Sequence, residues 1–198
     1  MSARKSFSAV AALALIAGAA AADMPRSFGI LEFGPDNTLF VADSAGGAIH
    51  AYALPVGGDA PEQDAAFNLL DVDQLATETL GATGRVIYSD LVVHPVTRGA
   101  CVSATTTVDG IETGAVLAIS RDGTVRKLDL DTYPSSKFTL QDTADAGVTF
   151  WRDIPAPSLT VTDLDYANGE LFVSGVSTGE FASTLRRVPF PFDGRATS

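Results

Sequence analysis

Two aspartates stand at matching places in a repeated sequence pattern, and they are the side chains best suited to carry chemistry. Asp90 and Asp163 each follow a hydroxyl-bearing residue and precede a leucine, and Asp165 lies two residues beyond Asp163. Carboxylate oxygens are the preferred ligands of hard divalent cations such as Ca²⁺. The three carboxylates therefore predict a site for Ca²⁺ or another divalent cation. The alternative is structural, because aspartates commonly accept hydrogen bonds from nearby backbone N–H groups.

The two histidines and the single cysteine form no recognised catalytic or metal-binding motif. His50 and His94 are too far apart in the sequence for a metal-ligand pair, and His94 is expected to be a solvated turn residue. Cys101 lies in an apolar run, which is typical of a buried and unreactive thiol. The sequence has no Gly-x-Ser-x-Gly motif, covalent haem motif, phosphate-binding loop or dinucleotide fingerprint. Those routes to hydrolysis and redox chemistry are excluded.

The elements that would position the aspartates are three copies of one hairpin pattern. Each copy has an apolar alternation, a tight turn and a second apolar run, and the copies are aligned at Leu31, Leu91 and Leu164. The turn of the third copy is Asn168-Gly169, a pair that favours a two-residue hairpin loop. The pattern predicts an all-β fold built from repeated antiparallel sheets.

One stretch has helical rather than strand periodicity. Apolar residues recur at helical spacing over residues 72–80, Asp71 precedes them as a candidate N-cap, and Gly81 follows them. We therefore expect one short helix, inserted between the first two copies.

The run FGPDNTLFVAD at residues 33–43, followed by GAI at 47–49, resembles the blade motif of β-propellers of the NHL, YVTN and SMP-30/gluconolactonase-like kind, secreted bacterial members above all. Residues 162–192 resemble a later blade of such proteins. The resemblance extends over most of residues 28–192. It implies a partial β-propeller, the N-terminal portion of about three four-stranded antiparallel blades. A β-sandwich and a half-closed barrel are the alternatives.

On this interpretation the blades occupy residues 28–70, 85–130 and 159–192, with inserts at 71–84 and 131–158 and a tail at 193–198. Three blades do not close a ring. Either the sequence is part of a longer chain, which we favour, or several copies complete a ring, or the open faces are covered in another way. Terminal blades would expose apolar faces and strand edges, which predicts self-association of the isolated chain.

The N-terminus has the form of a signal peptide over residues 1–22, with Arg4 and Lys5 before an apolar run and three alanines at its end. Without these residues the chain has 11 basic residues against 24 acidic ones. Such a balance repels nucleic-acid phosphates and anionic lipids. We expect an acidic periplasmic or secreted protein with no nucleic-acid partner and no stable membrane insertion after cleavage.

The expected function is that of a secreted, non-catalytic propeller module that binds a protein or small-molecule ligand on its loop face. The alternative is a metal-dependent lactonase or esterase of the SMP-30-like type, with carboxylates at the mouth of the channel. The resemblance implies an acidic and amide-bearing metal site for such an enzyme, and the candidate ligands are Glu32, Asn68, Asp90 and Asp163. The sequence does not decide between binding and catalysis.

Overall fold

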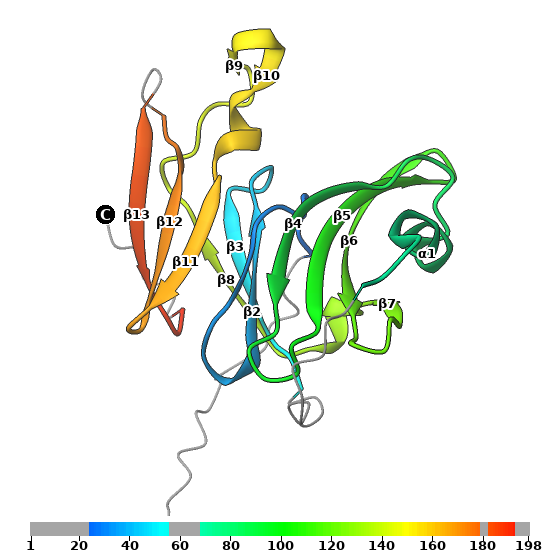
Figure 1. Cartoon of the computed structure of the whole chain (residues 1–198). Helices are drawn as coiled ribbons and strands as arrows, with labels where there is room; N and C mark the ends of the chain where they lie inside the picture. Colours follow the sequence, from blue (N-terminus) through cyan, green and yellow to red (C-terminus); the bar gives the residue numbers. More distant parts are fainter. Residues whose placement is uncertain (1–23, 56–67, 179–181, 193–198) are drawn as a thin grey trace, which may run out of the picture.

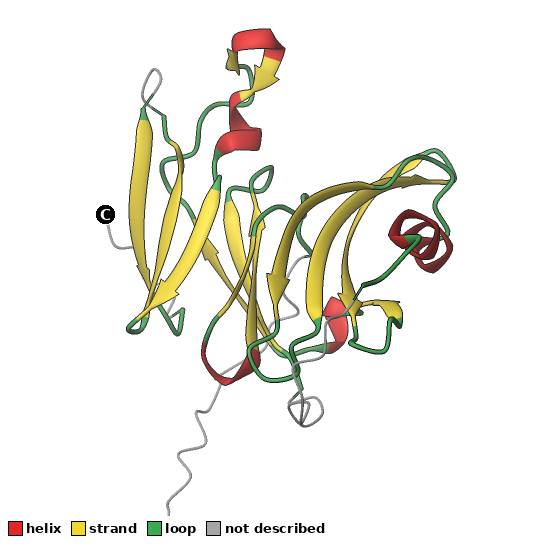
Figure 2. Ribbon diagram, viewed as in Figure 1, coloured by secondary structure: helices red, strands yellow, loops and turns green. Residues whose placement is uncertain are grey.

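The computed structural model describes residues 24–55, 68–178 and 182–192, in which strands predominate (Figure 2). These strands form four antiparallel sheets of four, four, three and two strands. The predicted all-β class is confirmed at this level. The predicted signal peptide at 1–22 and tail at 193–198 lie outside the described residues. Within the described part of the chain, no helix combines the length and the apolar character needed to cross a membrane.

The first sheet has the strand order β1 (Leu31–Phe33), β2 (Thr38–Asp43), β3 (Ala48–Ala53) and β8 (Ser135–Thr139). Its fourth strand comes from residues 131–158, the segment that the sequence analysis placed outside the blades as an insert, so part of this segment belongs to the first sheet. The sequence of β8 is mostly polar and has no apolar alternation, and the strand forms because it pairs with β3, with Phe138 opposite Ile49.

The second sheet has the strand order β4 (Ile87–Val93), β5 (Ala100–Val108), β6 (Ile111–Ile119) and β7 (Val125–Lys127). A β-bulge interrupts β4 between Tyr88 and Asp90. Bulges bend a strand and redirect the side chains beside them. This bulge therefore helps to set the direction of the Asp90 carboxylate.

The predicted helix is confirmed as α1 (Val72–Leu80). Its buried Ala76 packs with Ala104 and Leu117 of the second sheet. Gly81 ends the helix in the left-handed region at φ 62°. The predicted N-cap is wrong, however, because the Asp71 side chain makes no capping hydrogen bond, and its backbone has a left-handed conformation at φ 58°.

The third sheet consists of β11 (Asp163–Ala167), β12 (Glu170–Val176) and β13 (Ser183–Pro189), so among the described residues it has three strands where four were expected. Its first turn has positive φ at Asn168 (52°) and Gly169 (87°), which confirms the predicted hairpin. The small sheet pairs β9 (Thr149–Phe150) with β10 (Ile154–Pro155). Short 3₁₀ turns lie at η1 (Pro35–Asn37), η2 (Leu130–Thr132), η3 (Trp151–Asp153) and η4 (Ala156–Leu159).

Two apolar cores join the three larger sheets, and the first sheet contributes to both of them. Figure 1 shows the strands of the first sheet between those of the other two. Along β2, Leu39 and Val41 pack against the second sheet, whereas Phe40 and Ala42 pack against the third. This alternation is that of a strand buried on both faces. At the inner edge, β1 contacts both β4 and β11. The first sheet therefore lies between the other two, although it comes first in the chain.

The three predicted hairpin copies have matching register. Leu31, Leu91 and Leu164 each lie opposite a valine of the next strand, at Val41, Val102 and Val173 respectively. The aspartates match as well, because Asp90 lies opposite Ser103 and Asp163 lies opposite Ser174. The repeat recognised in the sequence is therefore also a repeat in strand pairing.

Candidate functional site

A pocket of about 430 Å³ lies at the end of the structure where the first and second sheets meet. The segment directly after β3, the β4–β5 turn and the β6–β7 hairpin all contribute to its walls. The lining includes Leu54, His94, Cys101, Arg121, Arg126 and Tyr133. Strand ends and turns from two sheets thus form a largely apolar site on a loop face of the molecule.

His94 is held in one orientation by the turn that it begins. Its Nδ1 atom accepts hydrogen bonds from the backbone N–H groups of Val96 and Thr97, both at 3.1 Å. Burial lowers the pKa of His94. The imidazole is therefore neutral at pH 7 with its proton on Nε2, because Nδ1 is occupied as an acceptor. This leaves Nε2–H as the hydrogen-bond donor of the ring.

The prediction that His94 is a solvated turn residue is wrong. Its exposed fraction is 9%, and its ring contacts the ring of Phe33 edge-on, with 4.9 Å between the centroids. Phe33 belongs to the first sheet and His94 to the turn after β4. The burial therefore results from the packing of two sheets, which the local sequence does not indicate.

The charged side chains that line the pocket are both cationic. Arg121 and Arg126 come from the β6–β7 hairpin, and no aspartate or glutamate is among the described lining residues. The nearest acidic neighbour in sequence, Asp122, accepts a hydrogen bond from the backbone N–H of Thr124 at 2.9 Å. In a chain with a net charge of −11, this cationic pocket is a local reversal of charge.

Cys101 lies in the wall of this pocket as a thiol rather than a thiolate. Burial raises the pKa of Cys101 to about 11, and the nearby Arg126 guanidinium opposes this only in part. Because the thiolate is the reactive form of cysteine, this residue is unreactive at neutral pH. The buried, inert thiol that the sequence predicts agrees with this environment.

The predicted metal ligand Asp90 is used as a structural acceptor. Its Oδ2 atom accepts a hydrogen bond from the backbone N–H of Leu31 at 2.8 Å. Leu31 lies on β1, so the bond joins the inner strands of the first and second sheets. Asp90 therefore has the structural role given as the alternative in the sequence analysis, that of an acceptor for a backbone N–H group.

Asp163 and Asp165 lie on the opposite side of the first sheet from Asp90. Leu164 and Tyr166 pack against the first sheet, so the alternate residues of β11 point away from it. The Oδ1 atom of Asp163 accepts a hydrogen bond from the backbone N–H of Leu164 at 3.1 Å. The three predicted ligands therefore do not converge on one point.

The pKa of Glu32 is affected by the charges of all three predicted metal ligands. Burial raises the pKa of Glu32, and the negative charges of Asp165, Asp163 and Asp90 raise it further, while a backbone hydrogen bond from Phe33 opposes the shift. Asn68, the amide candidate, is exposed. Within residues 24–55, 68–178 and 182–192, no group of three or more acidic, histidine or cysteine side chains is placed to hold a metal ion. The divalent-cation site stays a prediction without support from this geometry.

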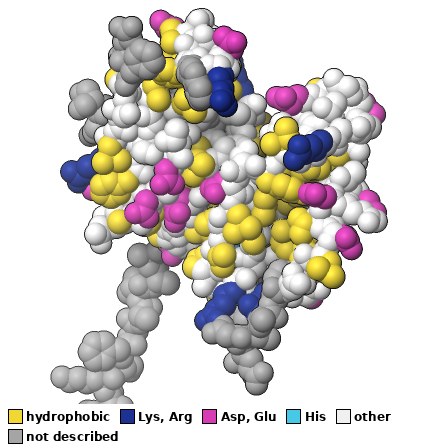
Figure 3. All heavy atoms as spheres, turned by 45° about the horizontal axis from the view of Figure 1, so that its top comes forward, with side chains coloured by type: hydrophobic (Ala, Val, Ile, Leu, Met, Phe, Trp, Pro, Cys, Tyr) yellow, Lys and Arg dark blue, Asp and Glu magenta, His cyan; other side chains and the backbone are white. Residues whose placement is uncertain are grey.

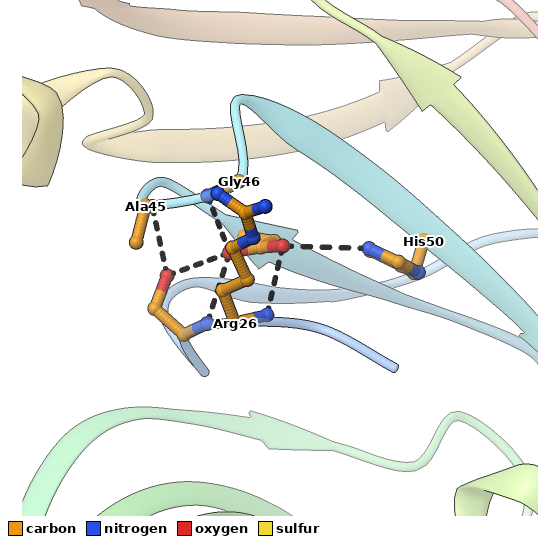
Figure 4. Close-up of polar contacts among 6 residues, drawn as sticks. Arg26, Ala45, Gly46 and His50 are labelled. Atoms are coloured by element: carbon orange, nitrogen blue, oxygen red, sulfur yellow. Dashed lines mark hydrogen bonds and ion pairs between the residues drawn. The ribbon is translucent and has the colours of Figure 1, made fainter. Parts of the chain in front are cut away.

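Asp43 is the most extensively hydrogen-bonded carboxylate of the first sheet, and the sequence analysis did not single it out. It accepts hydrogen bonds from the backbone N–H groups of Arg26, Ser27 and Gly46 at 2.8–2.9 Å, and His50 Nε2 lies 3.6 Å away (Figure 4). Burial alone would raise the pKa of Asp43, but these donors lower it to about 2. The carboxylate thus joins the N-terminal segment to the β2–β3 turn.

No protein-family model, curated protein or solved structure has significant similarity to this chain.

Proposed function

We propose that this chain is a secreted or periplasmic, non-catalytic binding module, and that its ligand is a small organic anion held in the pocket between the first and second sheets. The observation that carries the proposal is the charge of the pocket. Two arginines and largely apolar walls enclose a space of about 430 Å³ in an otherwise acidic chain. Ligand pockets are typically apolar cavities of roughly 300–1,000 Å³ with a few polar groups that orient the ligand.

The chemistry of the walls favours a carboxylate with an apolar body. A guanidinium group donates paired hydrogen bonds to a carboxylate, and such charge-assisted bonds are stronger than neutral ones. Leu54 and Leu128 supply apolar surface, and the Nε2–H of His94 supplies a neutral donor. An uncharged ligand of the same shape would lack the carboxylate that a guanidinium of the pocket can bind.

The proposed architecture is a partial β-propeller in which the three larger sheets are blades. Two observations support it. The inner strands β1, β4 and β11 lie next to one another, and Leu31, Leu91 and Leu164 have the same register in their hairpins. In a propeller, ligands bind at the ends of the blades, where turns from neighbouring blades meet. The pocket has such a position between two sheets.

Octanoate and octanamide form a matched pair of probes, since they share a chain and differ in charge. We expect octanoate to bind to the mature chain in isothermal titration calorimetry, and octanamide to bind at least about tenfold more weakly, as expected for the loss of charge-assisted hydrogen bonds. Arg126→Gln should weaken octanoate binding by a similar factor. Arg85→Gln, at an exposed site outside the pocket lining, is the control and should leave binding unchanged.

Equal affinity for octanoate and octanamide would contradict the proposal, and so would an Arg126→Gln variant that binds octanoate as tightly as the unmodified chain. Because Arg126 is an exposed side chain at the edge of the second sheet, its replacement should leave the fold intact. Circular dichroism spectra of the variants check this directly.

A further inference from the structure

The innermost strands of the three larger sheets each have a leucine with the same register, and the surroundings of these three leucines differ. Leu164 is 4% exposed and packs against the first sheet, and Leu31 is 3% exposed and packs against the second. Leu91, with the same register on the second sheet, is 56% exposed. The position that is covered by a neighbouring sheet in two cases is therefore uncovered in the third.

The uncovered leucine belongs to an apolar face of the second sheet. Val92 packs toward the first sheet, so Leu91 and Val93 point to the opposite face, where Val93 is 55% exposed. This face continues into a groove of about 480 Å³ that is lined by Val102 and Ile119 of the sheet and by Leu69 and Val72, just before and at the start of α1. The helix packs on the same face farther along, over Ala104 and Leu117, so the uncovered part is the one that carries Leu91 and Val93. Figure 3 shows hydrophobic side chains gathered over the part of the molecule that contains this sheet. We call this surface the open face of the second sheet.

The third sheet lies on the other side of the first sheet, and it also has an uncovered face. Leu171 and Val173 pack toward the first sheet, so Phe172 points outward. Across the strand pair, the Arg187 guanidinium lies 5.9 Å from the centroid of the Phe172 ring. Leu185, two residues before Arg187, is 69% exposed on the same face. We call this surface the outer face of the third sheet.

A contact inside the chain shows how such faces meet. Where the first sheet packs on the second, the Leu31 N–H donates to the Asp90 carboxylate. Leu91 matches Leu31, and Asp163 matches Asp90, by strand register. The Oδ1 atom of Asp163 accepts a hydrogen bond from the backbone N–H of Leu164 in the same chain. The contact between the first and second sheets thus pairs a leucine N–H with an aspartate carboxylate. The open face of the second sheet carries the matching leucine, and the outer face of the third sheet carries the matching aspartate.

We infer that two copies of this chain associate through these faces, with the open face of the second sheet of each copy seated on the outer face of the third sheet of the other. Each contact joins two different faces, and two copies related by a two-fold axis make this contact twice and close the assembly. Six larger sheets would then surround one axis. Burial of Leu91 and Val93 would remove the exposed apolar surface that distinguishes this face.

Sedimentation equilibrium of the mature chain tests the association. We expect a dimer, and we expect Leu91→Asp and Leu185→Asp each to raise its dissociation constant at least about tenfold, since each places a charge in both contacts. Ile111→Asp is the control, because Ile111 is as exposed as Leu185, at 69%, but lies at the far end of β6. This variant should dimerise like the unmodified chain.

Mixing the two defective variants identifies the arrangement. One of the two contacts in the mixed dimer has neither substitution, so an equimolar mixture should dimerise more tightly than either variant alone. A monomer at all concentrations, a dimer insensitive to Leu185→Asp, or a mixture without rescue would overturn the inference. Leu91 and Leu185 lie outside the pocket lining, so octanoate binding by the variants separates a failure of association from a failure of the proposed ligand site.

Discussion

Replacement of Asp43 by asparagine should destabilise the chain by about 2 kcal/mol at pH 7. The hydrogen-bond donors around Asp43 lower its pKa from the ordinary 3.8 to about 2, and each unit of such a shift corresponds to about 1.4 kcal/mol. The folded state has the lower pKa, so this stability is present above the ordinary pKa and is lost as the pH falls toward 2. Asparagine keeps one acceptor oxygen but places an NH₂ group among these donors, which include the N–H groups of Arg26 and Gly46.

The measurement is urea unfolding of the chain without residues 1–22 and of its Asp43→Asn variant at several pH values between 7 and 2, followed by circular dichroism. The difference in the free energy of unfolding should be largest at neutral pH and shrink below about pH 4. Asp36→Asn is the matched control, because Asp36 is exposed in the turn before β2 and tolerates asparagine at its φ of 52°. A loss that is the same at every pH would refute the electrostatic explanation.

Two further substitutions test a partly buried carboxylate and a buried hydroxyl. Glu32→Gln should stabilise the chain at neutral pH, because the pKa of Glu32 is raised in the folded state and its charge is therefore unfavourable there; the gain should vanish as the pH falls below the ordinary Glu range, in urea unfolding. Calcium-dependent stability that Glu32→Gln abolishes would instead favour the predicted metal site. Tyr52→Phe should raise the free energy of unfolding by up to about 1 kcal/mol, since the buried Tyr52 hydroxyl has no hydrogen-bond partner among the described residues. A loss of stability would show that this hydroxyl has a partner.

Local sequence signals were sufficient for the hairpins and the helix. Asn168 and Gly169 adopt the positive φ angles that a two-residue hairpin loop needs, and Gly81 ends α1 in the left-handed region. These features depend on the conformational preferences of a few adjacent residues. Asp71 shows the limit of such reasoning, because a residue type that favours capping does not cap when its backbone has another conformation.

The candidate site was only partly predictable. The sequence identified Asp90 as a repeated carboxylate and allowed it to be a backbone acceptor, but its partner Leu31 lies 59 residues away in the sequence. Arg121 and Arg126 stood in an ordinary hairpin, and nothing in their spacing indicated that they line a pocket with Leu54, which follows β3 of the first sheet. A pocket between sheets depends on which strand ends meet, and local periodicity carries no information about this.

The sequence by itself determined which residues alternate, where the chain turns and which carboxylates repeat, because these properties depend on backbone preferences and side-chain chemistry over a few residues. Only the tertiary structure decided that β8 joins the first sheet, that Phe33 buries His94, and that the first sheet lies between the other two. Long-range pairing is selected by the burial of apolar faces against one another, and many pairings satisfy the same alternation. The same physical reason makes the uncovered Leu91 informative, since its register matches two leucines that neighbouring sheets have covered.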